Sequence, residues 1–126
     1  MTFNGTKDGR SEVYIAPFRK ALVPRSEWIP ISGTQGGETP GFSHNDRLIF
    51  FTSDRDGFLC IWAQRLGPDM HPAGEPFAVY HFHQRRRSLR NLPTIRLAVG
   101  PKMIVFSQAE ITGKIWLLDP AKSNSQ

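Results

Sequence analysis

Two histidines stand two positions apart in the segment His81-Phe82-His83. Successive side chains of an extended strand point to opposite faces of the sheet, so both imidazoles would lie on one face. Imidazole nitrogen binds zinc, but a zinc site needs three or four protein ligands. The further ligands that we considered are His44, Asp46, His71 and Asp69. Nothing in the sequence brings them to the pair, so we predict a polar strand face at the outer edge of a sheet and no metal site.

A cluster of arginines follows these histidines, and it consists of Arg85, Arg86, Arg87 and Arg90. Guanidinium groups form paired hydrogen bonds with phosphate and carboxylate groups, so the cluster is a candidate contact for an anionic partner. Proteins that bind single-stranded nucleic acid interleave such charges with aromatic side chains. Only Phe82 lies close by in the sequence, so we do not predict nucleic-acid binding. The alternative is a solvated loop without a partner.

No other motif indicates catalysis or a cofactor. The segment Asp54-Arg55-Asp56-Gly57 begins like a calcium loop, but the further oxygen ligands that end in a glutamate are missing, so we interpret it as a hairpin turn. The sequence has no Gly-x-Ser-x-Gly elbow, Walker loop or Gly-x-Gly-x-x-Gly motif. The single cysteine, Cys60, cannot form an internal disulfide, and we expect a small buried side chain. We therefore predict no catalytic residues, no cofactor and no enzyme activity.

The composition is that of a folded domain, with 39% hydrophobic and 21% charged residues among 126. The net charge of +5 is local, because residues 76–109 hold six of the 16 basic residues and no acidic one. We therefore do not expect the whole surface to coat nucleic acid. We expect neither a signal peptide nor a membrane span, since residues 1–6 lack an apolar core and no apolar run approaches the roughly 20 residues of a span.

An internal repeat organises the chain. Tyr14, Trp62 and Trp116 each follow a glycine turn and an aliphatic residue, at spacings close to 50 residues. The strand before the turn also repeats, since residues 48–51 correspond to residues 103–106. A period near 50 is typical of propeller blades, and short β-branched and aromatic runs closed by Gly, Asp or Asn favour strands over helices. We predict an all-β chain in which Trp28, Trp62 and Trp116 pack one blade against the next.

The predicted strands form three units within one domain over residues 1–126. The first unit, residues 9–33, holds strands Val13–Phe18 and Trp28–Ile31. The second, residues 39–83, is a four-stranded antiparallel meander made of Gly41–Ser43, Leu48–Ser53, Leu59–Gln64 and Phe77–Phe82. The third, residues 94–119, holds Ile95–Val99, Met103–Gln108 and Lys114–Leu118, and a polar tail follows at residues 120–126. Arg85–Pro93 is the loop between the last two units.

The residues predicted to be buried at matching positions are Ile49, Phe51, Ile61, Ile104, Phe106 and Ile115.

The segment from Thr39 to Gly57, followed by Ile61-Trp62, resembles the blade of TolB-type, WD-like β-propellers. That blade has a Pro-x-aromatic-Ser start, an Asp-Gly turn, an apolar strand ending in Ser, an Arg-x-Gly turn and an aliphatic–aromatic strand. The chain departs from this pattern at His44-Asn45-Asp46, where the turn lacks its glycine. The third unit also lacks the Pro-x-aromatic-Ser start.

The resemblance implies a partial β-propeller of about two and a half four-stranded blades, where a closed ring has about four to eight. It implies partners in the remaining blades of a longer chain or in another copy, and a periplasmic location. The function that follows is a noncatalytic scaffold that binds a protein or a small ligand. The alternative is an accessory or sensor propeller of a larger peptidase or kinase-like receptor, because such propellers accompany catalytic domains whose motifs are missing here.

Overall fold

The computed structural model describes residues 1–83, 87–89, 97–110 and 112–116. In this part of the chain the regular elements are β-strands and two single-turn 3₁₀ helices, η1 (Arg25–Glu27) and η2 (Gly33–Gln35). The predicted all-β class is confirmed. None of the described residues forms a helix with the length and apolarity that crossing a bilayer requires.

The first sheet is antiparallel, and its strands are β1 (Thr2–Lys7), β2 (Arg10–Ile15) and β3 (Ile29–Pro30), in that order. The β1–β2 hairpin turns at Asp8 and Gly9, whose φ angles of 51° and 77° suit a two-residue turn. The sequence does not predict β1, because this strand offers a single large apolar side chain, Phe3. The predicted strand Val13–Phe18 is also corrected, since β2 ends at Ile15 and Phe18 is 87% exposed.

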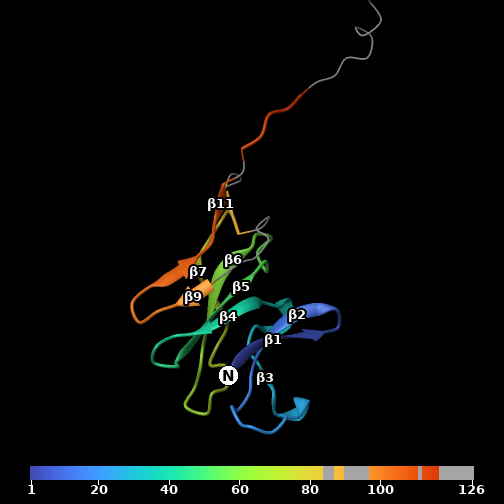
Figure 1. The fold of residues 1–126 in the computed structure, drawn as a ribbon, viewed down its shortest axis with the longest axis vertical. Helices are drawn as coiled ribbons and strands as arrows, with labels where there is room; N and C mark the ends of the chain where they lie inside the picture. Colours follow the sequence, from blue (N-terminus) through green and yellow to red (C-terminus); the bar gives the residue numbers. More distant parts are fainter. Residues whose placement is uncertain (84–86, 90–96, 111, 117–126) are drawn as a thin grey trace, which may run out of the picture.

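The second sheet is the predicted meander. Its strands β4 (Glu38–Phe42), β5 (Leu48–Ser53), β6 (Cys60–Arg65) and β7 (Phe77–Tyr80) are antiparallel and adjacent in chain order. The bounds of β5 are those expected from the sequence, and those of the other strands differ by one to three residues. Figure 1 shows this sheet in the centre of the molecule, with the first sheet beside it.

The β4–β5 and β5–β6 turns of this sheet place different residues at a positive φ angle. In the β5–β6 turn Gly57 has a φ of 90° and donates its N–H to the carbonyl of Asp54. In the β4–β5 turn, where the expected glycine is missing, Asp46 adopts a φ of 55° instead. Aspartate tolerates this left-handed conformation better than most residues. The side chain of Ser43 also accepts the N–H of Leu48, which closes the turn.

The third unit differs from the predicted three strands. The hairpin of β9 (Leu97–Val99) and β10 (Ile104–Phe106) is present, although part of the predicted strand Ile95–Val99 lies outside the described residues. Residues 112–116 form no strand and run away from the sheets (Figure 1). Ile115 is fully exposed and Trp116 is 87% exposed, so the prediction that they pack in the core was wrong. Sequence similarity to the earlier strands does not supply the neighbouring strand that would bury them.

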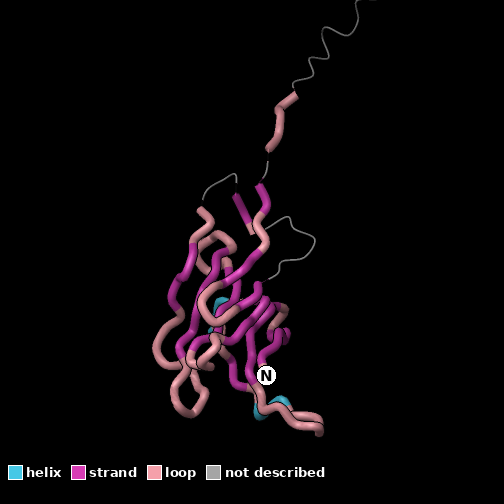
Figure 2. Tube along the Cα trace, turned by 60° about the vertical axis from the view of Figure 1, so that its left-hand side comes forward, coloured by secondary structure: helices cyan, strands magenta, loops and turns pink. Residues whose placement is uncertain are grey.

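The loop between the second and third units contains a short strand that we had not predicted. This strand, β8 (Arg87–Ser88), pairs with β11 (Ala109–Glu110) in a two-stranded ladder. Figure 2 shows this ladder as a pair of short strands beyond the end of the larger sheets.

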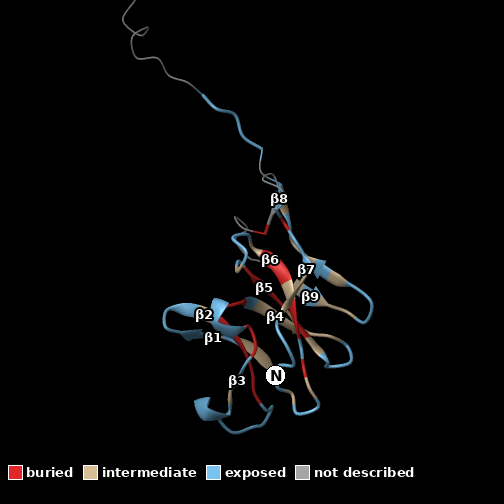
Figure 3. Ribbon diagram, turned by 180° about the vertical axis from the view of Figure 1, so that it is seen from behind, coloured by how far each residue is buried: buried red, intermediate tan, exposed pale blue. Residues whose placement is uncertain are grey.

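Two apolar cores lie on opposite faces of the second sheet. The first core joins the first two sheets through Val13, Ile15, Ile31, Ile49, Phe51 and Leu66. The second core joins the other face to β9–β10 and to the segment near β8, through Ile61, Phe82 and Leu89, with Leu59, Leu97 and Phe106 packed against them. Figure 3 shows buried residues concentrated in β5 and β6, between more exposed outer elements. Burial of Ile49, Phe51 and Ile61 is confirmed, whereas Ile104 and Phe106 are only half-buried.

Candidate functional site

A group of four side chains with metal-binding atoms lies at one end of the second sheet. Asp56 comes from the β5–β6 turn, Cys60 begins β6, and His81 and His83 follow the end of β7. Each contributes one nitrogen, oxygen or sulfur atom, and these atoms all lie within 4.8 Å of one another. We call these four residues the Asp–Cys–His–His cluster.

Strand register explains why these residues meet. Ile61 of β6 pairs with Tyr80 of β7, so Cys60 and His81 are the next two positions along neighbouring antiparallel strands. Ser53 pairs with Cys60 at the last position of β5, directly before the turn that carries Asp56. The chain therefore delivers one ligand atom from the turn, one from the start of β6 and two from the segment after β7.

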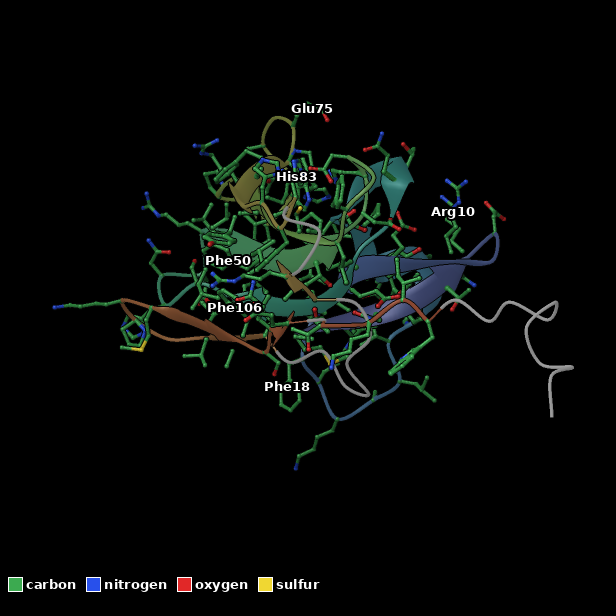
Figure 4. All side chains as sticks on the ribbon, turned by 90° about the horizontal axis from the view of Figure 1, so that it is seen from above. Arg10, Phe18, Phe50, Glu75, His83 and Phe106 are labelled. Atoms are coloured by element: carbon green, nitrogen blue, oxygen red, sulfur yellow. The ribbon has the colours of Figure 1, made fainter. Side chains whose placement is uncertain are left out.

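Alternation of side chains after β7 places the two histidines together. Phe82 is buried against Ile61 in the second core, and its ring lies 5.4 Å from that of Phe106. The histidines on either side of Phe82 consequently point to the opposite face. Figure 4 shows His83 on the other side of the second sheet from Phe106. The prediction that His81 and His83 share one face therefore agrees with their contacts.

Three atoms of the cluster form a tight triangle. The Oδ2 atom of Asp56 lies 3.0 Å from Nδ1 of His81 and 2.9 Å from Nε2 of His83. The two ring nitrogens lie 3.1 Å from each other. The other carboxylate oxygen, Oδ1, accepts the backbone N–H of Phe58 at 3.3 Å, which holds the carboxylate in the turn.

The sulfur atom occupies the buried side of the cluster. Cys60 is 0% exposed, and its Sγ accepts the backbone N–H of Phe82 at 3.3 Å. The side chains of His81 and His83 are each 48% exposed, and that of Asp56 is 22% exposed. The cluster is therefore closed by protein on the sulfur side and open to solvent on the imidazole side.

Burial and hydrogen bonds set the acidity of the two acidic members. Burial raises the pKa of the Cys60 thiol, against a smaller lowering by the N–H of Phe82. Partial burial acts to raise the pKa of Asp56, but its hydrogen bonds with His83, the Phe58 N–H and His81 outweigh this and lower it.

The remaining candidate residues lie apart from this cluster. The imidazole of His71 lies beside Asp69, with Nδ1 3.4 Å from Oδ2, and neither residue joins the cluster. Of the predicted anion-binding arginines, Arg87 is exposed in β8, with Glu110 of β11 opposite it in the ladder. Arg85, Arg86 and Arg90 lie outside the described residues.

A groove of about 690 Å³ separates the second sheet from the β9–β10 hairpin. Its lining is mainly apolar and includes Phe50, Tyr80, Val99, Met103 and Phe106. Val105 of β10 points away from the groove and is 58% exposed, and Met103, which precedes β10 at the rim of the groove, is 64% exposed. The hairpin thus has one apolar side over the groove and further apolar side chains facing solvent.

No protein-family model, curated protein or solved structure matches this chain.

Sequence reasoning missed that Cys60 and Asp56 complete the histidine pair. The predicted meander contained the necessary signal, because pairing Leu59–Gln64 with Phe77–Phe82 in antiparallel register sets Cys60 near His81. The other candidate ligands in the sequence, His44, Asp46, His71 and Asp69, do not belong to the cluster.

Proposed function

We propose that this chain is a noncatalytic β-propeller scaffold, and that it binds another β-sheet of the same kind through the outward face of the β9–β10 hairpin. The sheets serve as blades in this proposal. The observation that carries it is the use of both faces of the second sheet, which packs against one neighbouring sheet through each of its two cores. Face-to-face stacking of successive antiparallel meanders is the arrangement that propeller blades require.

The exposed side of β9–β10 supplies the binding surface. Its backbone pairing sets Val105 opposite Ala98, and both residues are exposed, as is Met103 nearby. Apolar side chains grouped in this way on a short two-stranded hairpin suit packing against a further sheet. Among the described residues β9 and β10 pair only with each other, so their outer backbone edges are available to a further strand.

Hydrodynamic measurements on matched lysine variants test this surface. We expect the wild-type chain to self-associate at high micromolar concentration in analytical ultracentrifugation, and Val105→Lys to shift it toward the monomer. Leu22→Lys is the control, because Leu22 is 97% exposed in the loop between β2 and η1, away from the hairpin. A monomeric wild-type chain, or equal loss of association in the two variants, would contradict the proposal.

A further inference from the structure

Hydrogen bonds alone do not readily explain the close approach of Asp56 Oδ2, His81 Nδ1 and His83 Nε2. Each atom lies within 3.1 Å of the other two. A neutral imidazole carries one N–H, so a ring nitrogen either donates or accepts. If both nitrogens are protonated, the two N–H groups crowd together over one oxygen. If neither is protonated, three lone pairs face one another. If only one is protonated, its N–H is shared between the other nitrogen and the carboxylate oxygen, whose lone pairs still face each other. A cation in the centre attracts all three lone pairs.

The donor set indicates which cation would fit. One thiolate, two imidazole nitrogens and one carboxylate oxygen are all ordinary zinc ligands, and four protein ligands make a closed tetrahedral site. Calcium and magnesium prefer oxygen ligands throughout, so Cys60 and the imidazoles argue against them. Zn²⁺ also balances the charge, because the Cys60 thiolate and the Asp56 carboxylate together contribute two negative charges.

The distances are close to those of a tetrahedral zinc site. Ligand atoms about 2.0–2.3 Å from a central zinc lie roughly 3.3–3.6 Å from each other. The three measured edges of 2.9, 3.0 and 3.1 Å are slightly shorter, and every pair of ligand atoms lies within 4.8 Å. Small side-chain movements would therefore bring all four atoms to bonding distance.

Contacts around the ligands already hold them in place. The backbone N–H of Phe82 points at Sγ of Cys60, and that of Phe58 binds the second carboxylate oxygen of Asp56. Such outer hydrogen bonds are typical of metal sites, where they orient the ligands. The buried ring of Phe82 fixes the backbone between the two histidines. The half-exposed imidazoles leave a path for the ion from solvent.

We propose that Asp56, Cys60, His81 and His83 bind one Zn²⁺ ion, which fastens the β5–β6 turn to the chain segment that follows β7. Binding forms four bonds to the metal and releases the proton of the Cys60 thiol to solvent. The site is structural, because all four tetrahedral positions are taken by protein. It joins two parts of the second sheet that are about 25 residues apart in the sequence.

Zinc titration of the full chain against a chromophoric chelator tests the proposal. We expect one equivalent of Zn²⁺ per wild-type chain and a raised melting temperature in its presence. The double variant His81→Ala, His83→Ala should bind at least about 100-fold more weakly, since loss of an outer-shell partner alone costs roughly 10–100-fold. The imidazoles are half-exposed, so this variant is expected to fold. Equal zinc affinity in the wild type and the double variant would overturn the site.

His71→Ala is the matched control, because His71 is an exposed histidine beside an aspartate without a cysteine or a second histidine. It should bind zinc as the wild type does, and a loss equal to that of the double variant would overturn the proposal.

Cobalt(II) in place of zinc reports the sulfur ligand through its thiolate-to-metal charge-transfer absorption. We expect this band in the wild type and its loss in Cys60→Ser. A wild-type cobalt complex without the band would overturn the four-ligand site.

Discussion

The guanidinium group of Arg55 donates a hydrogen bond to the backbone carbonyl of Ser32, with Nη2 2.7 Å from the oxygen. Arg55 lies in the β5–β6 turn of the second sheet, whereas Ser32 lies beyond β3 of the first sheet. The same group donates to the carbonyl of Gly36 at 3.3 Å and lies over the rings of Phe51 and Trp62, at 5.2 and 4.8 Å. One side chain therefore holds the β5–β6 turn to the segment after β3 through polar contacts, and it packs on two aromatic side chains of its own sheet.

Replacement of Arg55 by methionine should separate the polar contribution from the packing contribution. Methionine keeps an unbranched apolar side chain but leaves the carbonyl of the fully buried Ser32 without this donor. We expect the free energy of unfolding to fall by about 1–3 kcal/mol, the usual result of leaving a buried acceptor unsatisfied. Urea denaturation measures it. Arg47→Met, at an exposed position in the β4–β5 turn, is the control, and an equal effect in both variants would show that the bridge does not stabilise the fold.

Phe51 is the large side chain at the centre of the first core, and it is 0% exposed. Phe51→Ala should lower the free energy of unfolding by about 3–5 kcal/mol, because it removes buried apolar surface and leaves a cavity. Phe18→Ala should change it little, since Phe18 is 87% exposed. Thermal and urea unfolding of the three proteins would test this. Unchanged melting of the Phe51 variant would mean that this core does not form in solution.

Gly57 allows the β5–β6 turn to close, with a φ of 90°. Gly57→Ala should destabilise the chain by roughly 1–2 kcal/mol, because a Cβ is unfavourable at positive φ. A Cβ at Gly57 would meet no atom within 4 Å, so the effect is one of backbone conformation and not of collision. Gly113→Ala is the control, since Gly113 also has open space around it but not a positive φ. Two variants of equal stability would argue against the turn geometry.

Local pattern was sufficient to predict the second sheet. Residues 48–64 combine alternating apolar side chains with a turn that ends in Gly57, and β5 and β6 follow from these features alone. The third unit could not be predicted in the same way. Ile115 and Trp116 repeat the pattern of Ile61 and Trp62, but burial depends on a neighbouring strand. In the described residues no strand forms there, and both side chains remain exposed.

The Asp–Cys–His–His cluster illustrates the same division between local and long-range information. Spacing alone sets His81 and His83 on one face, since residues two apart in an extended segment point the same way. Their approach to Asp56 depends on the register of β6 against β7, which shifts between Ile61 and Trp62. The two predicted strands set Cys60 near His81 only if they pair end to end, and a shift of one residue would move the histidines to the opposite face.

The exposed Arg87 is paired with Glu110 across the β8–β11 ladder, so an acidic residue stands opposite one arginine of a cluster that has no acidic residue beside it in the sequence. Arg85→Gln, Arg86→Gln and Arg87→Gln together should weaken binding of inorganic polyphosphate roughly tenfold at low salt, because each exposed ion pair contributes about 0–1 kcal/mol. The difference should shrink as added salt screens these charges.

A triple variant with the same loss of charge, Arg10→Gln, Lys20→Gln and Arg47→Gln, changes exposed positions elsewhere and should retain more affinity. Isothermal titration at two salt concentrations, with circular dichroism to verify folding, measures the effect. Equal affinity of the wild type and the first triple variant at low salt would identify the arginine cluster as a solvated connection between sheets and remove it as a binding site.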